Sequence, residues 1–501
     1  MKVLNLSQTR MTESLAMGGG ISEERLMENA GAAAANIIKN EYDIVKKRVT
    51  VVAGGGNNGG DGYVIARKLK EYGAFVVIVF SSIPVSKTAE YMKSRALSVN
   101  IPVLYYYDDA EYCSELIINS DFVIDSLFGI GFHGEPEKDI ANIIDCLNKS
   151  NGKKIAVDLP SGIYCDSGNT AKTVFKADLT ITFIGYKPCH FLFPAAGFCG
   201  KVVCSDIGIS EKYFRDYSAE TVEFDSVKPL LFSPSQNAHK GTKGKVAVIA
   251  GSLNMPGAAR FCAEGAMRSG AGLVKIFSSD TVKNITAAAL PEAIYENICI
   301  DSGSFSLEKT DPYKVNSYDS VVIGPGIGTD DKTKEFVKAI IKNITKPLVL
   351  DADALNILSE NTELLKEIKA PAVVTPHAGE MSRLTGKTIE EIENNRVFFA
   401  SEFSKNYGVI TVLKGAYTVI ATPEGKTYIN LTGNSVLATA GSGDILSGII
   451  AGLAAGNNSL ELSVVAGVSL HGKTGDIAAD KYGKRGIIAT DLLKLIITAF
   501  N

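Results

Sequence analysis

A short stretch near the end of the chain, Ala440-Gly441-Ser442-Gly443-Asp444, has residue types and spacing that could support chemistry. It opens an apolar run, Ile445 to Gly452, and so stands at the start of a predicted helix. The first amides of a helix have no partner within it and lie at its positive end, so small residues there favour an anion site. A carboxylate beside an anion is electrostatically unfavourable. We therefore interpret Asp444 as a group that takes a hydroxyl proton during phosphoryl transfer. The alternative is an ordinary glycine-rich turn with Asp444 at the helix start.

A second glycine-rich turn lies near the beginning of the chain. It follows a helix predicted over Ile21 to Lys39 and a buried strand predicted over Arg48 to Ala53. The turn itself, Gly54 to Gly62, precedes a helix predicted over Tyr63 to Tyr72 and a strand over Phe75 to Phe80. This order is a βαβ unit, which predicts a parallel sheet.

Gly54, Gly56 and Gly59 in this turn match the pattern G-x-G-x-x-G. A dinucleotide site also needs an acid at the end of the second strand, where it binds the ribose. Ser81-Ser82 occupy that place, so ordinary NAD binding is not predicted. The core Asn57 to Asp61 is more distinctive, because two amides, a carboxylate and bare backbone can bind a ribose, a phosphate or a hard cation. The alternative is a turn in which Asn and Gly adopt left-handed backbone.

Two further predicted strands end in acids. Phe122 to Asp125 leads into a glycine-rich turn, and Lys154 to Asp158 leads into Leu-Pro-Ser-Gly. Ligands of parallel sheets bind at the carboxyl ends of the strands, so we expect both acids to share one crevice with Asn57 to Asp61. A last strand, predicted over Ala177 to Lys187, ends in a lysine that is either a charge partner or solvated.

Together these motifs resemble the NAD(P)H-hydrate epimerase family over roughly residues 10–210: Asn57-Asn-Gly-Gly-Asp-Gly62, Asp125-Ser-Leu-Phe-Gly-Ile-Gly131 and Asp158-Leu-Pro-Ser-Gly162. That family epimerises hydrated NADH and NADPH, which are damaged at the nicotinamide ring. The resemblance implies that Asp158 contacts the hydrate, and we assign acid–base catalysis to it, since inverting a hydroxyl-bearing carbon needs proton transfer. It implies a potassium ion (K⁺) held by Asn58, Asp125 and Ser161. It implies hydrate binding by Asn57, Asn58, Gly59, Gly60, Asp61, Gly129, Ile130, Gly131, Phe132, His133, Gly134 and Glu135.

A second series of strand ends begins with the strand predicted over Gly244 to Ala250, which runs into Gly251-Ser252 and a helix. Glycine in such turns allows the backbone to approach a ligand closely. A lone histidine is usually structural, but His377 shares this sheet edge, and we favour a functional role. The other predicted strands end in Gly324-Pro-Gly326-Ile-Gly328, Asp351-Ala-Asp353, Thr375-Pro-His377 and Lys414-Gly-Ala-Tyr-Thr418.

With Ala440 to Asp444, these turns resemble ADP/ATP-dependent NAD(P)H-hydrate dehydratase, a family with a ribokinase-like fold, over roughly residues 225–500. The resemblance implies phosphate transfer to the hydrate's hydroxyl, then elimination of phosphate, because phosphate leaves more easily than hydroxide. Magnesium (Mg²⁺) is expected to screen the phosphates, and the motifs do not distinguish ADP from ATP. The implied hydrate-binding residues are Ala258, Gly326, His377 and Asp444, with Asp444 catalytic. The implied nucleotide-binding residues are Lys414, Gly415, Ala416, Tyr417, Thr418 and Gly443.

One motif competes for the nucleotide. Gly467 to Thr474 matches the P-loop pattern G-x-x-x-x-G-K-[ST]. A true P-loop follows a strand and opens a helix, whereas the apolar spacing from Leu460 to Val468 predicts a helix before it. The P-loop is therefore the weaker alternative, and it predicts that Lys473→Ala abolishes nucleotide binding.

The whole composition favours a globular cytoplasmic protein. The net charge of −4 gives no reason to expect nucleic acid or an anionic membrane as partner. Eight cysteines without C-x-x-C pairs and five histidines without zinc spacing are typical of a reduced compartment. We find neither an 18-residue uncharged apolar run nor a signal-peptide pattern, so we expect a cytoplasmic location.

The length of 501 residues allows two or three domains, and alternating strands and helices predict the α/β class. We expect an N-terminal Rossmann-like three-layer α/β/α domain at residues 1–220 and a C-terminal ribokinase-like α/β/α domain at 221–501. The polar stretch Ser210 to Ser235 contains the expected boundary. A homo-oligomer is expected from the family alone.

The two resemblances predict a bifunctional repair enzyme whose partners are small molecules, the hydrates NADHX and NADPHX and the nucleotide ADP or ATP. It would interconvert the R and S hydrates and dehydrate the S form. The enzymatic alternative is a ribokinase-like kinase of a small vitamin precursor with an N-terminal ligand-binding module. A non-enzymatic alternative, in which the first domain only binds, is disfavoured by the presence of Asn58, Asp125, Asp158 and Ser161.

Overall fold

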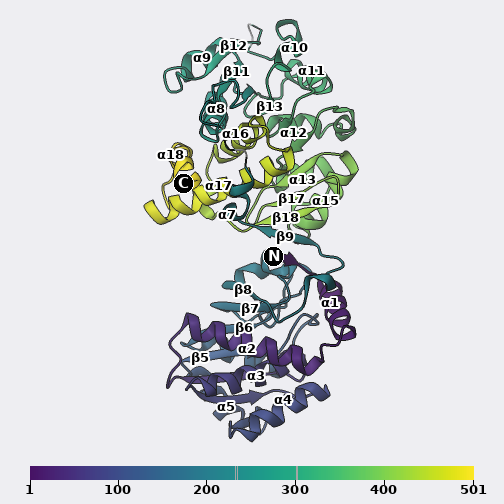
Figure 1. The fold of residues 1–501 in the computed structure, drawn as a ribbon, viewed down its shortest axis with the longest axis vertical. Coiled ribbons are helices and arrows are strands. Elements are labelled where there is room, and N and C mark those ends of the chain that lie inside the picture. Colours follow the sequence, from purple (N-terminus) through teal and green to yellow (C-terminus); the bar gives the residue numbers. More distant parts are fainter. Residues whose placement is uncertain (232, 234, 301–302) are drawn as a thin grey trace. The chain divides into compact units, whose positions relative to one another are not determined.

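The computed structural model describes residues 1–231, 233, 235–300 and 303–501. The chain divides into two compact units, Met1–Ser218 and Ala219–Asn501, whose helices and strands are labelled in Figure 1. Both are α/β domains, and each is described by itself. Within the described residues, no helix is both long and apolar enough to cross a membrane.

The first unit is built on a parallel sheet with strand order β4-β3-β2-β5-β6-β7-β8. The chain runs from β2 to β3 and β4 on one side and then to β5 on the other, so the order reverses at β2. Ligands of such sheets bind outside the carboxyl ends of the strands at this reversal. The strands of this sheet are β2 (Arg48–Ala53), β3 (Phe75–Phe80), β4 (Val103–Tyr105), β5 (Phe122–Ser126), β6 (Lys153–Val157), β7 (Leu179–Phe183) and β8 (Lys201–Ser205), and the short strand β1 (Lys2–Val3) is not part of it.

Helices cover both faces of this sheet. Successive strand residues face opposite sides: Val51 packs in a core with α2, α3 and α4, and Val52 packs in a core with α5 and α6. Both faces are buried, which is why the strands are continuously apolar, and the predicted three-layer arrangement is present. The helices are α1 (Leu6–Gly18), α2 (Glu23–Glu41), α3 (Asn57–Glu71), α4 (Lys87–Ser98), α5 (Ala110–Ile118) and α6 (Lys138–Lys149), with a short 3₁₀ turn η1 (Pro188–His190).

Helix α3 begins at Asn57, and the predicted start at Tyr63 is wrong. The stretch expected to be a loop forms the first turns of the helix instead. Glycine disfavours helix, but packing requires it here, because a Cβ at Gly59 would lie 2.0 Å from the carbonyl oxygen of Gly54. The glycines therefore let the helix start approach the end of β2.

The strand predicted over Ala177 to Lys187 is also too long, because β7 covers only Leu179–Phe183. The chain leaves the extended conformation at Ile184, whose φ is 70°. Lys187 consequently lies in the loop before η1, not at the end of a strand.

The second unit has a sheet with strand order β9-β18-β17-β16-β15-β14-β13-β10-β11-β12. Strand β10 pairs in parallel with β11 and β13, so the order reverses at β10, while β17 is antiparallel to β16 and β18. The strands are β9 (Ala219–Val222), β10 (Lys245–Ile249), β11 (Leu273–Ser278), β12 (Ile294–Asn297), β13 (Ser320–Ile323), β14 (Leu348–Leu350), β15 (Ala372–Val374), β16 (Ile410–Leu413), β17 (Val419–Ala421) and β18 (Thr427–Asn430).

Helix α16 (Ser442–Ala455) lies in the core of this unit and packs closely on α8 (Pro256–Arg268). Glycine makes the approach possible, because a Cβ at Gly448 would lie 2.0 Å from the carbonyl oxygen of Cys262. The middle of α16 is thus packed directly against α8. The other helices are α7 (Phe224–Val227), α9 (Asp280–Thr286), α10 (Pro312–Val315), α11 (Asp331–Ile340), α12 (Asp353–Leu358), α13 (Ala378–Thr385), α14 (Ile389–Asn394), α15 (Arg396–Tyr407), α17 (Leu460–Tyr482) and α18 (Ala489–Phe500).

Candidate functional site

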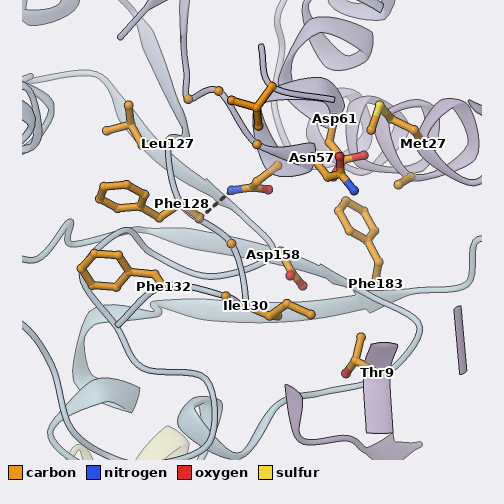
Figure 2. A pocket seen from close by; sticks show the side chains of 18 of the residues that line it. Thr9, Met27, Asn57, Asp61, Leu127, Phe128, Ile130, Phe132, Asp158 and Phe183 are labelled. Carbon is orange, nitrogen blue, oxygen red and sulfur yellow. Dashed lines mark hydrogen bonds between the residues drawn. The ribbon is translucent and has the colours of Figure 1, made fainter. Parts of the chain in front are cut away.

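A cavity of about 870 Å³ opens at the reversal point of the first sheet, between the residues that follow β2 and β5. Figure 2 shows the rings of Phe128 and Phe132 on one side of it and Phe183 on the other, with the carboxylate of Asp158 between them. Apolar walls with a few convergent polar groups are typical of sites for small organic ligands. The cavity therefore suits a ligand with a planar ring.

Asp158 follows β6 and has a φ of 64°, which is uncommon outside glycine. His190 supports this backbone, since its Nε2 lies 3.3 Å from the carbonyl oxygen of Asp158. The Nδ1 of His190 accepts the amide of Lys187 at 3.0 Å, so Nε2 carries the proton and donates to that carbonyl. Burial, and then the charge of Lys187, lower the pKa of His190 to about 3, and the ring is neutral.

The carboxylate of Asp158 forms a buried ion pair with Lys187. The Nζ of Lys187 lies 2.6 Å from Oδ1 of Asp158 and also donates to Thr182 Oγ1 at 2.7 Å and to the Phe183 carbonyl at 2.9 Å. Burial lowers the pKa of Lys187, but the charge and hydrogen bond of Asp158 outweigh it, and the pKa is raised. The sequence left open whether Lys187 is a charge partner or solvated, and the structure shows that it is the charge partner of Asp158.

Two more carboxyl groups, Glu13 of α1 and Asp61 of α3, line the same cavity. Burial raises the pKa of both, the charge of Asp158 raises them further, and Lys187 lowers them. Neighbouring carboxylates resist joint ionisation. The cavity therefore combines Asp158, paired with Lys187, with two carboxyl groups whose pKa is raised, and groups in such different surroundings suit acid–base catalysis.

Beneath the cavity wall, Asp125 of β5 is buried. Its Oδ2 accepts the amide of Ser161 at 2.7 Å, and its Oδ1 accepts the Ser161 hydroxyl at 2.7 Å. Burial raises the pKa of Asp125 to about 6, although these hydrogen bonds lower it. The Asn58 amide donates to the Phe128 carbonyl at 2.7 Å, while its buried Oδ1 has no hydrogen-bond partner in the part of the chain that is described. Unused oxygen acceptors beside a buried carboxylate fit a hard cation.

The structure brings most of the residues predicted for the first site to this cavity, although their contact with a hydrate stays a prediction. Gly59 and Gly60 are buried within α3, Gly134 is outside the wall, and Asp125 and Ser161 lie beneath it. The predicted residues in the wall are Asn57, Asn58, Asp61, Gly129, Ile130, Gly131, Phe132, His133, Glu135 and Asp158.

The sequence analysis missed the contribution of helix α1, which brings Thr9, Arg10 and Glu13 to the cavity. One local signal was available. Asn5 caps the helix and forms a reciprocal capping box with Gln8, a pattern that marks a helix start. The packing of this helix against a distant strand end is not visible in any local pattern.

In the second unit, Gly441 has a φ of 87° and α16 begins directly after it. Asp444 lies in the first turn, where burial, and then the charge of Asp351, raise its pKa to about 6 against the opposing effect of Lys414. A base of this strength is ionised at neutral pH and still able to accept a proton. A Cβ at Gly443 would lie 3.5 Å from Nζ of Lys414, so the helix start and the lysine face the same space.

An ion pair fixes Lys414 beside this helix start. Its Nζ donates to Asp351 Oδ1 at 2.8 Å, while the Ser447 hydroxyl of α16 donates to Asp351 Oδ2 at 2.6 Å. Burial raises the pKa of Asp351, but Lys414 and these hydrogen bonds outweigh it, and the pKa is lowered. Burial lowers the pKa of Lys414, but Asp351 and Glu380 outweigh it and raise the pKa. The helix amides and a charged lysine thus form a site that suits phosphate.

The turn Lys414 to Thr418 is supported by the buried Arg396. Its Nη2 donates to the Leu413 carbonyl at 2.7 Å, and its Nη1 pairs with Glu393 at 2.9 Å. Gly415 has a φ of 159°, and a Cβ there would lie 2.6 Å from the guanidinium of Arg396. Glycine is required here because the guanidinium fills the space.

Gly326 follows β13 with a φ of 63°, and a Cβ there would lie 2.9 Å from the Cβ atoms of Ala258 and Met255. The turn after β13 therefore packs directly on the start of α8. His377 caps α13, accepting the amide of Glu380 on Nδ1 at 3.3 Å, and its side chain is 55% exposed. Contacts of Ala258, Gly326 and His377 with a hydrate stay predictions.

The P-loop alternative is excluded by geometry. The motif Gly467 to Thr474 lies wholly inside α17, so the helix predicted there is confirmed and no glycine-rich loop follows a strand. The Nζ of Lys473 pairs with both carboxylate oxygens of Asp225, at 2.6 and 2.7 Å.

Substitution of Lys473 by alanine is therefore expected to leave nucleotide affinity within about twofold of wild type. The lost ion pair is exposed, so the free energy of unfolding should change by less than about 1 kcal/mol. Calorimetric titration with ADP and ATP, beside a thermal melt, measures both quantities. Loss of nucleotide binding by a folded Lys473→Ala protein would restore the P-loop interpretation.

Comparison with known proteins covers both units. A family model described as NAD(P)H-hydrate dehydratase matches residues 246–498, and one described as YjeF-related protein N-terminus matches residues 23–189. A bifunctional NAD(P)H-hydrate repair enzyme of Thermofilum pendens is 35% identical, and the match covers 100% of this chain and 96% of that enzyme. The enzyme of the same name from Escherichia coli is 33% identical, over 96% of this chain and 90% of the relative.

Two solved structures resemble the second unit. A ribokinase-like superfamily protein of Enterococcus faecalis has a TM-score of 0.50 and 25% identity, with 56% of this chain and 95% of that chain covered. An ADP/ATP-dependent NAD(P)H-hydrate dehydratase of Bacillus subtilis, co-crystallised with ATP and Mg²⁺, has a TM-score of 0.49 and 32% identity, with 56% and 99% covered. The predicted ribokinase-like fold of the C-terminal half is confirmed.

Proposed function

Because the chain belongs to the family of bifunctional NAD(P)H-hydrate repair enzymes, we propose that it interconverts the R and S forms of NADHX and NADPHX and dehydrates the S form to NADH or NADPH. The observation that carries the proposal is that one chain holds two separate acid-bearing sites, one in the cavity at the reversal point of the first sheet and one at the start of α16 in the second unit. Epimerisation belongs to the first unit and dehydration to the second.

Dehydration uses the adenine nucleotide to convert the hydroxyl into a leaving group. The amides at the start of α16 and the charged Lys414 hold the phosphates of ADP or ATP. Asp444 takes the proton as the hydroxyl oxygen bonds to the terminal phosphorus, and the P–O bond to the remaining nucleotide breaks with its electron pair leaving on that nucleotide. Phosphate then leaves with the C–O electron pair, and the neighbouring carbon loses a proton to solvent as the double bond forms. Among the described residues no three His, Cys, Asp or Glu side chains form a metal cluster, which fits magnesium bound mainly through the phosphates.

Epimerisation uses the cavity of the first unit. The aromatic walls hold the nicotinamide ring, and Asp158, positioned by its contact with Lys187, exchanges a proton with the oxygen on the inverted carbon. Asn58, Asp125 and Ser161 would hold potassium, supported by the unpaired Oδ1 of Asn58 and the buried Asp125 carboxylate. The ion would neutralise that carboxylate and order the loop after β5.

The remaining assignments complete the proposal. Residues 1–220 form the epimerase domain and residues 221–501 the dehydratase domain. The partners are NADHX, NADPHX and ADP or ATP; the protein acts in the cytoplasm as a homo-oligomer and binds neither nucleic acid nor membrane.

The proposal is tested by incubating the purified protein with mixed NADHX epimers and either ADP or ATP, while NADH absorbance is followed. We expect complete recovery of NADH with at least one nucleotide, because epimerisation feeds the R form to the dehydratase. Recovery of only the S fraction would remove the epimerase assignment. Absence of recovery, with phosphorylation of a small vitamin precursor, would favour the kinase alternative.

A further inference from the structure

Helix α1 brings a carboxyl group into the first cavity that the mechanism above does not use. Glu13 lies one helical turn after Thr9, and both side chains line the cavity, so they share one face of the helix. In the view of Figure 2, Thr9 lies on the other side of Asp158 from Asp61. Glu13 of α1, Asp61 of α3 and Asp158 after β6 therefore bring carboxyl groups to the cavity from three different elements, and Glu23, Glu135 and Glu137 line it as well.

Glu13 is a carboxyl group without a local partner. Within the described residues, no hydrogen bond or ion pair satisfies its side chain, whereas Asp158 is bound by Lys187 and Thr182. A half-buried carboxyl on a cavity wall is costly unless a ligand or a proton satisfies it. The charged groups that face it are Asp158, Lys187, Arg10, Glu23 and Asp61.

The surroundings of the two acids differ. The Nζ of Lys187 lies 2.6 Å from Oδ1 of Asp158, whereas burial, and then the charge of Asp158, raise the pKa of Glu13. Paired carboxyl groups with opposite protonation states are a recurrent arrangement for acid–base catalysis.

We propose that Glu13 is a second catalytic acid–base group of the epimerase, which protonates the departing hydroxyl while Asp158 serves the added water. This inference rests on the proposed function. Hydration of a carbon–carbon double bond next to the ring nitrogen places the hydroxyl on the carbon bonded to that nitrogen. Inversion then requires the hydroxyl to leave from one face and return on the other.

In one direction, Glu13 gives its proton to the hydroxyl, the C–O bond breaks with its electron pair leaving on water, and the nitrogen lone pair forms a C=N⁺ bond. A water on the opposite face then adds to that carbon, the C=N electrons return to nitrogen, and Asp158 takes the proton of the added water. Glu13 ends ionised and Asp158 protonated, which is the starting state for the reverse direction, and exchange with solvent resets either state.

The test compares wild type with Glu13→Gln, which keeps shape and removes the proton, and with Glu13→Asp, which keeps the acid. Glu111→Gln on α5, an exposed glutamate outside the cavity wall, is the matched control. R-to-S conversion is followed by chromatographic separation of the hydrates. We expect kcat of Glu13→Gln to fall at least about 100-fold with KM nearly unchanged, partial recovery in Glu13→Asp, and wild-type rates in Glu111→Gln.

A pH profile gives a second readout. Wild-type kcat should fall as the pH rises and Glu13 loses its proton. The residual activity of Glu13→Gln should not show this decrease with rising pH. Dehydration of pure S hydrate, measured on the same samples, should be unchanged because it belongs to the second unit, and a thermal melt close to that of wild type reports that the first unit is folded. The inference is overturned if Glu13→Gln epimerises the hydrate within threefold of the wild-type rate, or if only KM changes. Absence of epimerisation in wild type itself overturns the proposed function and this step with it.

Discussion

Replacement of Asp444 by asparagine is expected to reduce nucleotide-dependent dehydration of the S hydrate by about 10²- to 10⁴-fold, the range for loss of a general base. The amide keeps the shape of the side chain in the first turn of α16 but cannot accept the hydroxyl proton. Lys414 and Asp351 keep their contacts with each other, so nucleotide affinity should change little. Dehydration is measured as NADH absorbance, and affinity by titration with ADP.

Stability should change in the opposite direction from activity. The pKa of Asp444 is raised to about 6 in the folded protein, so its charge opposes folding once the pH rises through that value. Asparagine removes this charge, and at pH 8 the melting temperature of Asp444→Asn should be no lower than that of wild type. A variant that is inactive but as stable as wild type has lost a catalytic group and not its fold. Such an exchange of stability for activity is frequent at active sites.

The same pKa sets the pH dependence of the wild-type enzyme. Below about pH 6 Asp444 holds a proton and cannot act as base, so dehydration of the S hydrate should fall about tenfold per pH unit. Epimerisation by Asp444→Asn, measured on the R hydrate, should equal wild type because the other site lies in the first unit. Full dehydration activity in this variant would remove Asp444 from the mechanism.

The buried strands β2 and β3 were the most predictable elements of this fold. Continuous apolar runs located β2 and β3 to the residue, since parallel strands buried on both faces carry no polar alternation. The start of α3 was not predictable from propensity, because Gly59 and Asn57 favour turns and only the contact of Gly59 with Gly54 shows why a helix begins there. Tertiary packing decided that boundary.

The site residues also divide into those that local sequence patterns reveal and those that depend on tertiary packing. Asp158 and Asp444 follow from their places after a strand and at a helix start, which local patterns reveal. Glu13 does not, because its role depends on how α1 lies across strands far away in the sequence. The partner of Lys187 could not be predicted for the same reason. The 2.6 Å contact joins a loop lysine to an aspartate at a strand end, and no local sequence pattern indicates it.

Replacement of Asp158 should stop use of the R hydrate and spare the S hydrate. We expect Asp158→Asn to lower R-to-S conversion by about 10²- to 10⁴-fold, because the group that exchanges a proton at the inverted carbon is lost. Dehydration of pure S hydrate with ADP or ATP should remain within twofold of wild type. Equal loss on both epimers would argue against two independent sites.

Loss of fold is the competing explanation, because Asp158→Asn leaves the buried Lys187 without its negative partner. Breaking a buried ion pair from one side costs about 3–5 kcal/mol, so the melting temperature of the first unit should fall. The double variant Asp158→Asn with Lys187→Met removes both charges and should recover much of that stability. If Asp158 acts chemically, the double variant melts near wild type and still fails to convert the R hydrate. If Asp158 only balances Lys187, the double variant regains epimerisation together with stability.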